Sequence, residues 1–169
     1  MSPAKTVISV RSLNKVHQDL NELFVRHQIY LMRRDIEGAL VILRELHEKY
    51  TLHIHDEEAL LLPVYKQKVK PIPPGGAVEF YIQEHKKIKR MLDEFVGKVA
   101  GWHKKDNFTP LHLVRLFDRH YTFRDLLNHH HAREDTFLYR WLDRLLNTAD
   151  IKAIFTKMEQ IPDNIKSLI

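Results

Sequence analysis

The sequence predicts an all-α protein folded as an antiparallel four-helix bundle with up-down-up-down topology. Four long stretches carry apolar side chains three or four residues apart, which is the spacing of one helix face. No stretch alternates apolar and polar residues with a period of two, so we expect no strands. The connections between the stretches are short, which makes consecutive helices antiparallel neighbours. A short N-terminal lead over residues 1–11 precedes the bundle, and a short C-terminal helix follows it.

The first two helices are expected at residues 12–33 and 35–68. Asp35 is the expected N-cap of the second helix, and Glu37 lies in its first turn, where the helix dipole favours an acid. Pro63 lies inside the second stretch and is expected to kink it, because proline cannot donate the helical hydrogen bond. The inward face of the first stretch is apolar except for two histidines and consists of Leu13, His17, Leu20, Phe24, His27 and Leu31.

A break rich in proline and glycine, at residues 70–76, separates the first helix pair from the second. The third helix is expected at residues 77–102 and the fourth at 109–146. Thr109 is the expected N-cap of the fourth helix, and Pro110 occupies its first helical position. The C-terminal helix is expected at residues 150–160, with Pro162 ending it.

Composition bounds the possible functions. The 169 residues are predicted to form one domain, residues 1–169, with the bundle over about residues 12–146. The absence of cysteine excludes disulfides, thiolate zinc sites, iron–sulfur clusters and thiol catalysis. The net charge of +5 comes from 27 basic and 22 acidic residues that are interspersed, which favours solvated helix faces over a nucleic-acid interface. We see no secretory leader and no bilayer-spanning apolar run, and we expect a cytoplasmic protein.

The chain contains 12 histidines, and histidine is the commonest metal-ligand side chain. Two of them belong to a repeated His-x-x-x-Glu pattern: Glu57 follows His53 by four residues, and Glu134 follows His130 by four residues. Residues four apart share a helix face, so each pair interrupts an apolar stripe. A buried carboxylate is costly unless it is paired or binds a metal. The repeated pairs therefore indicate a buried metal site.

Distances along the chain place these residues at one level of the bundle. Residues equidistant from the turn of an antiparallel hairpin lie side by side. His17 and His53 are equidistant from the predicted cap of the second helix. His85 and His130 are equidistant from the turn between the third and fourth helices. Glu57 and His85 are equidistant from the proline-rich break. At about 1.5 Å per residue, His17 and His53 each lie about 27 Å from their shared turn. The predicted metal ligands are His17, His53, Glu57, His85, His130 and Glu134.

The remaining histidines fail this test of level or lie off the apolar stripe. His27 and His120 point inward at another level, and we expect them to be structural side chains hydrogen-bonded to their neighbours. His129 and His131 flank His130 and are expected to be solvated. The others are expected at the surface, at the bundle edge or off the ligand face, and they are His47, His55, His103 and His112.

Four imidazoles and two carboxylates converging in a bundle core are typical of a dimetal carboxylate site. Two carboxylates can bridge two metals, and each metal then takes two imidazoles. Nitrogen and oxygen ligands without sulfur suit iron or manganese, and zinc is an alternative. The other interpretation is a buried polar network without metal, in which every member must find a hydrogen-bond partner.

These residues resemble the hemerythrin-like family, whose HHE domains carry histidines and His-x-x-x-Glu pairs on a four-helix bundle. The resemblance covers about residues 12–146, and the Glu-Glu-x-x-Leu run that begins at Glu57 and the Pro63 after it are also similar. The resemblance implies a non-haem di-iron centre with an oxo or hydroxo bridge between two iron ions. Members of the family bind dioxygen, sense oxygen or iron, or handle nitric oxide and peroxide.

Two departures from the family bear on function. Oxygen-carrying hemerythrins have a second histidine one turn after the third-helix histidine, and Lys89 stands there in this chain. A protonated lysine cannot bind a metal, so one iron would have an open or water-filled position, whereas a Lys89 that extends to solvent would play no role. Di-iron repair proteins of the superfamily carry an N-terminal cysteine pair, which this chain lacks.

Three functions stay open on the sequence alone. The first is the binding or sensing of dioxygen or a related small ligand, such as nitric oxide or peroxide. The second is a di-iron enzyme that acts on peroxide, dioxygen or nitric oxide. The third is an iron-binding or storage module. The sequence indicates a small-molecule partner, no nucleic-acid or membrane partner, and no identified protein partner.

Overall fold

The computed structural model describes residues 8–161 and 163–166. These residues form helices and connecting segments, with no strand among them, which confirms the all-helical prediction. Two predictions fall partly outside this range. Residues 1–7 of the expected N-terminal lead are not among the described residues, and neither is Pro162, which was expected to end the C-terminal helix.

The first half of the chain forms one long helical segment and then a second that contains a change of helix type. Asp35 caps the second segment as predicted, because its side chain accepts a hydrogen bond from the backbone N–H of Gly38. The elements are η1 (a 3₁₀ turn, Val10–Leu13), α1 (Asn14–Met32), α2 (Ile36–Asp56), η2 (a π-helical turn, Glu57–Leu61) and α3 (Leu62–Lys68).

The second half repeats this arrangement. Thr109 caps the last long segment as predicted, since its hydroxyl accepts a hydrogen bond from the N–H of His112, and Pro110 begins the helix. The third long helix extends beyond its predicted end at residue 102. The elements are α4 (Val78–Lys105), α5 (Pro110–Arg133), η3 (a π-helical turn, Glu134–Tyr139), α6 (Arg140–Leu145), α7 (Thr148–Phe155) and α8 (Asp163–Lys166).

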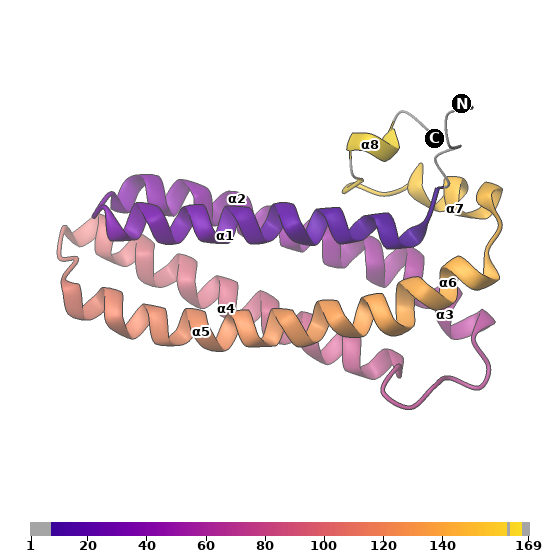
Figure 1. The fold of residues 1–169 in the computed structure, drawn as a ribbon. Coiled ribbons are helices and arrows are strands. Elements are labelled where there is room, and N and C mark those ends of the chain that lie inside the picture. Colours follow the sequence, from indigo (N-terminus) through magenta and orange to yellow (C-terminus); the bar gives the residue numbers. More distant parts are fainter. Residues whose placement is uncertain (1–7, 162, 167–169) are drawn as a thin grey trace, which may run out of the picture.

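Figure 1 shows α1, α2, α4 and α5 lying side by side along an elongated molecule, with α7 and α8 gathered at one end. Each long helix contacts two of the others, because α1 and α4 both contact α2 and α5. Buried leucines, phenylalanines and tyrosines from all four helices fill the space between them. Burial of this apolar surface drives the helices together.

Both π-helical turns begin at a glutamate of the repeated pattern. The sequence predicted a kink at Pro63. The structure has a π-helical turn just before this proline, where the Leu62 N–H bonds the Glu57 carbonyl five residues back. The turn at Glu134 has no proline within it. A π turn interrupts the regular helix, and such turns are frequent at functional sites. Each His-x-x-x-Glu pair therefore ends at a junction between α- and π-helix.

Residues 8–11 pack against the far end of the bundle. Ile8 and Val10 are buried. The carboxylate of Asp143 on α6 accepts hydrogen bonds of 2.6 Å from the Ser9 hydroxyl and from the Val10 N–H. The prediction of a loose lead is therefore wrong for these four residues, because an acid outside the repeated pattern holds them.

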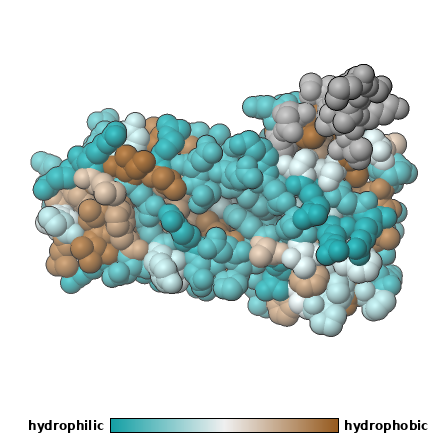
Figure 2. Space-filling view, viewed as in Figure 1, coloured by the Kyte–Doolittle hydropathy of each residue, from teal (hydrophilic) through white to brown (hydrophobic). Residues whose placement is uncertain are grey.

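The surface in Figure 2 is mostly hydrophilic, and apolar residues gather toward the end that carries the α1–α2 and α4–α5 turns. Among the exposed apolar side chains, Met32 ends α1 and Leu111 and Val114 lie in the first turns of α5. Within the described part of the chain, no helix is both long enough and apolar enough to cross a membrane.

Candidate metal centre

The structure brings all six predicted residues to one place in the core. Each comes from a different element, and each side chain is buried. Their nitrogen and oxygen atoms form two groups of four, and within each group the possible ligand atoms lie within 4.8 Å of one another. Both groups contain the same two glutamates. The first group is His17, His53, Glu57 and Glu134, and the second is Glu57, His85, His130 and Glu134.

The first group centres on the imidazole of His17. Its Nε2 lies 2.9 Å from His53 Nε2 and 3.1 Å from Glu134 Oε2. His53 Nε2 lies 3.7 Å from Glu57 Oε1. Two imidazole nitrogens that face each other at this distance can share only one proton. The imidazole nitrogens of His17 and His53 and one oxygen each of Glu57 and Glu134 thus surround one small volume, as the ligands of a cation do.

The second group is arranged in the same way around the other oxygens of the two glutamates. His85 Nε2 lies 3.3 Å from Glu57 Oε2 and 3.7 Å from Glu134 Oε1. His130 Nε2 lies 2.7 Å from Glu134 Oε1. Each glutamate thus directs one oxygen to each group, which is the arrangement of a carboxylate that bridges two ions.

Several of these buried atoms have no aligned hydrogen-bond partner. They are Glu57 Oε2, His85 Nε2 and both carboxylate oxygens of Glu134. Burying a carboxylate without partners costs several kcal/mol at least, so a core that tolerates it normally binds a metal there. The donor set is nitrogen and oxygen only, which suits iron, manganese or zinc. The residues present therefore fit a pair of metal ions.

In the protein without metal, the two buried glutamates influence each other's pKa. Burial and the neighbouring charge of Glu134 raise the pKa of Glu57 to about 7. Burial would also raise the pKa of Glu134, but the charge of His130 and the close approach of the His17 and His85 rings outweigh it and hold that pKa well below its ordinary value. The cluster therefore keeps one carboxylate ionised more readily than the other.

Two of the four imidazoles are held from behind by carboxylates. Burial lowers the pKa of His85 and of His130, but the surrounding carboxylates raise it, to about 11 for His85 and about 9 for His130. His85 Nδ1 lies 2.9 Å from Glu58 Oε1, and His130 Nδ1 lies 3.0 Å from Glu84 Oε2. Metal-binding histidines commonly donate their second ring N–H to a carboxylate, which fixes the ring and raises its basicity.

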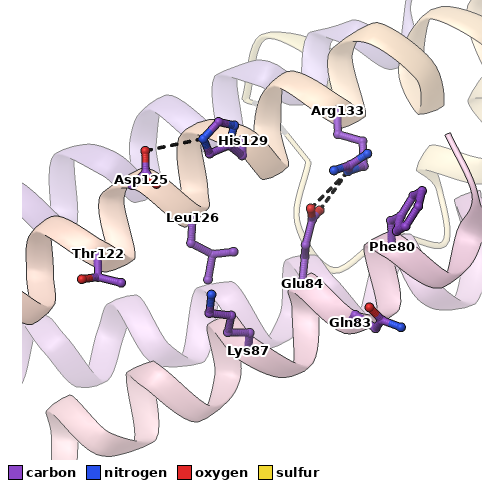
Figure 3. A pocket seen from close by; sticks show the side chains of 9 residues that line it. All are labelled: Phe80, Gln83, Glu84, Lys87, Thr122, Asp125, Leu126, His129 and Arg133. Atoms are coloured by element: carbon purple, nitrogen blue, oxygen red, sulfur yellow. Dashed lines mark hydrogen bonds and ion pairs between the residues drawn. The ribbon is translucent and has the colours of Figure 1, made fainter. Parts of the chain in front are cut away.

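Glu84 itself is fixed across the α4–α5 interface. The Nε of Arg133 donates to both oxygens of Glu84, at 3.1 and 3.3 Å. Figure 3 shows these two side chains pointing toward each other from neighbouring helices, at the wall of a surface pocket. Arg133 also donates to the Gly75 carbonyl and lies over the ring of Phe80 at 4.9 Å. The ring of His130 is therefore oriented by a charged network that begins at the surface.

Sequence reasoning missed two residues beside the site. Tyr139, the last residue of η3, is fully buried and donates a hydrogen bond to Glu57 Oε1. His131 is partly buried rather than solvated, so that prediction is wrong. Its ring lies parallel to that of His17, with centroids 3.8 Å apart and an angle of 4°. Burial lowers the pKa of His131 to about 3, which keeps the ring neutral. Nothing in the helical period pointed to His131, because it follows the inward His130 directly.

The other inward histidines lie apart from both groups. His27 and His120 are buried, and their rings are 5.3 Å apart. His27 Nδ1 lies 2.9 Å from the Ala39 carbonyl oxygen, and His120 Nδ1 lies 3.3 Å from the side-chain nitrogen of Gln28, so each has the expected neighbour.

Lys89, one turn after His85, is partly buried. The pKa of Glu58 is lowered chiefly by its hydrogen bond to His85 and further by the charge of Lys89.

Comparison with known proteins gives one match. A family model described as the hemerythrin HHE cation-binding domain matches residues 76–169, which include His85, His130 and Glu134. Curated proteins and solved structures gave no match. The matched residues are more than half of the chain, and the helical fold and buried histidine–glutamate cluster agree with this family. The chain belongs to the hemerythrin HHE cation-binding domain family.

Proposed function

We propose that this protein is a non-haem di-iron protein that binds or senses dioxygen or a related small ligand, such as nitric oxide or peroxide. The observation that carries the proposal is the sharing of Glu57 and Glu134 by two groups of buried ligands. A single metal ion would leave the second pair of imidazoles unexplained. A buried polar network without metal would leave carboxylate oxygens without hydrogen-bond partners, which is rare in protein cores. Two ions account for both features.

The roles of the residues follow from the two groups. His17 and His53 would hold one ion, and His85 and His130 the other, while Glu57 and Glu134 would serve both. Glu58 and Glu84 would keep the rings of His85 and His130 in the tautomer that leaves Nε2 free. A bound di-iron pair would supply reversible electron transfer to a small ligand. The surrounding apolar core limits the access of water and of larger molecules to the centre.

The long helices are proposed to form the up-down-up-down antiparallel bundle that the sequence predicts. This topology explains how residues so distant in the chain share one level, since each hairpin returns the chain to the same height. It also explains why the two π turns lie together at that height.

A second candidate function is a di-iron enzyme acting on peroxide, dioxygen or nitric oxide. Lys89 favours it, because this residue occupies the place where an additional imidazole would complete the coordination of the ion held by His85 and His130. An incompletely ligated ion leaves room for a reacting ligand. An iron-binding or storage module is the third possibility, and it would require no exchangeable ligand.

Metal analysis and absorption spectroscopy of the iron-loaded protein test these functions. We expect two iron ions per chain and a charge-transfer band that appears in air and disappears on removal of oxygen. Irreversible bleaching of the band during peroxide decay would favour the enzyme. Failure of the protein to retain iron after anaerobic reconstitution would contradict the di-iron proposal itself.

A further inference from the structure

Tyr139 lies among the ligand atoms of the first group rather than beside them. Its hydroxyl oxygen donates to Glu57 Oε1 and lies 3.2 Å from His17 Nε2. The side chain is fully buried, so the hydroxyl faces no solvent. Both neighbours belong to the group that would hold a single ion.

The distances around His17 Nε2 have the spacing of an octahedral site. When metal–ligand bonds are about 2.1 Å, adjacent ligand atoms lie about 3.0 Å apart, which is the bond length multiplied by the square root of two. His17 Nε2 lies 2.9 Å from His53 Nε2, 3.1 Å from Glu134 Oε2 and 3.2 Å from the Tyr139 oxygen. The phenol oxygen therefore stands where another ligand of that ion would stand.

We propose that Tyr139 is a further protein ligand, binding as a phenolate to the metal ion held by His17 and His53. The proposal rests on the dimetal function proposed above. As the ion binds, the Tyr139 O–H bond breaks, an oxygen–metal bond forms and the proton leaves to solvent. No electron is transferred in this step.

The charge of the bound ion would stabilise the phenolate form of Tyr139. Without metal, the buried Tyr139 hydroxyl donates its proton to Glu57 Oε1 and faces no solvent. A bound divalent or trivalent cation becomes the largest local charge and favours the deprotonated form, as it does for coordinating thiols. Metal binding to such a site releases protons.

Tyr139 differs in this respect from the other buried tyrosines. The hydroxyl of Tyr50 lies 3.4 Å from His131 Nε2, and that of Tyr81 donates to the Arg133 carbonyl at 3.5 Å. Tyr65 is buried with its hydroxyl unpartnered. In the first copy of the repeated pattern, the position that corresponds to Tyr139 is Leu62. The repeat therefore supplies one phenol, and the two metal positions become chemically unequal.

Substitution of Tyr139 by phenylalanine tests the assignment, with Tyr65→Phe as the matched control. Each protein is loaded with iron, oxidised in air and assayed for metal content, visible absorption and resonance Raman scattering. We expect the unmodified protein and Tyr65→Phe to show a phenolate-to-iron(III) band with tyrosinate vibrations. Tyr139→Phe is expected to retain iron but lose both signals.

A second readout uses zinc, which has no redox chemistry. Calorimetric titration in buffers of different ionisation enthalpy counts the protons released on binding, and we expect Tyr139→Phe to release one fewer per chain than Tyr65→Phe. Two bound irons without tyrosinate vibrations in the unmodified protein, or signals that persist in Tyr139→Phe, would overturn the assignment of Tyr139 alone. A protein that binds no metal would overturn the dimetal proposal as well.

Discussion

Glu84 on α4 holds His130 on α5 by a hydrogen bond between Oε2 and Nδ1, which lie 3.0 Å apart. The other side of the same imidazole faces Glu134, with Nε2 2.7 Å from Oε1. His130 is thus fixed between a carboxylate in the proposed metal centre and one outside it. The outer carboxylate lies at the wall of the pocket in Figure 3, so it can be replaced while all six proposed ligands are kept.

Replacing Glu84 by glutamine is expected to weaken metal retention by about 10–100-fold, because an outer carboxylate raises the basicity of a metal-binding histidine. Competition with a chelator of known affinity measures this effect. Glu79→Gln, on the exposed side of the same helix, is the matched control. Equal retention by the two variants would show that Glu84 does not support the centre.

The second acids of the two repeats are expected to differ. Each acid directly follows the glutamate of its repeat, so helical spacing alone places both Glu58 and Asp135 off the ligand face. In the structure, however, Glu58 contacts His85. We therefore expect Glu58→Ala to accelerate metal loss. Asp135 instead accepts hydrogen bonds from Arg11 and Asn14, so Asp135→Ala should leave metal content unchanged and destabilise the fold by about 1 kcal/mol. Chelator kinetics and urea unfolding separate the two effects, and identical kinetics for both variants would contradict the assignment.

Acid sensitivity is expected from the buried histidine pair remote from the centre. Burial lowers the pKa of His27 from 6.5 to about 4, although its hydrogen bond to Ala39 opposes the shift. Between these two values the unfolded chain binds a proton that the folded chain does not. The contribution of neutral His27 to the free energy of unfolding is therefore fully present above pH 6.5 and falls by about 3 kcal/mol as the pH drops to 4.

The variant His27→Gln removes this titration and should flatten the pH dependence of the unfolding free energy by up to one proton. Urea unfolding of metal-free protein between pH 4 and pH 7, the window given by these two states, measures it. The exposed His55→Gln variant serves as the control. An unchanged slope in His27→Gln would show that His27 is already protonated in the folded protein.

Lys89 is expected to favour anionic ligands at the centre. It lies one turn beyond His85, and its charge acts on Glu58. Replacing it by alanine should weaken azide binding to the iron-loaded protein by up to about tenfold at low salt, and by less at high salt because the attraction is screened. Lys89→His should supply an imidazole and close the position. Superimposable azide titrations of all three proteins would refute a role for Lys89.

Much of the fold could be predicted because helix signals are local. The caps Asp35 and Thr109 and the apolar period set the helix starts, and the structure agrees with them. The π turn at Glu134 could not be predicted, since no proline lies within it to mark a break in the helix. The end of α4 was misplaced because a polar run, residues 103–105, continues the helix on its exposed side.

The convergence of six distant residues could be predicted from the sequence, because the helical period and the distance of each residue from its turn are both regular. The residues around them did not follow. His131 neighbours an inward residue and should point away, yet it covers the face of His17. Tyr139 is brought to Glu57 by the changed register of the π turn. Such contacts depend on how side chains of separate helices meet, which spacing within one helix does not encode.

Glu57 and Glu134 are proposed to be shared by two metal ions in one chain. An anomalous difference map recorded at the iron absorption edge, from crystals of the iron-reconstituted protein, tests it most directly. We expect two peaks within about 4 Å of each other, both in contact with Glu57 and Glu134. A single peak, or peaks away from these two carboxylates, would contradict it.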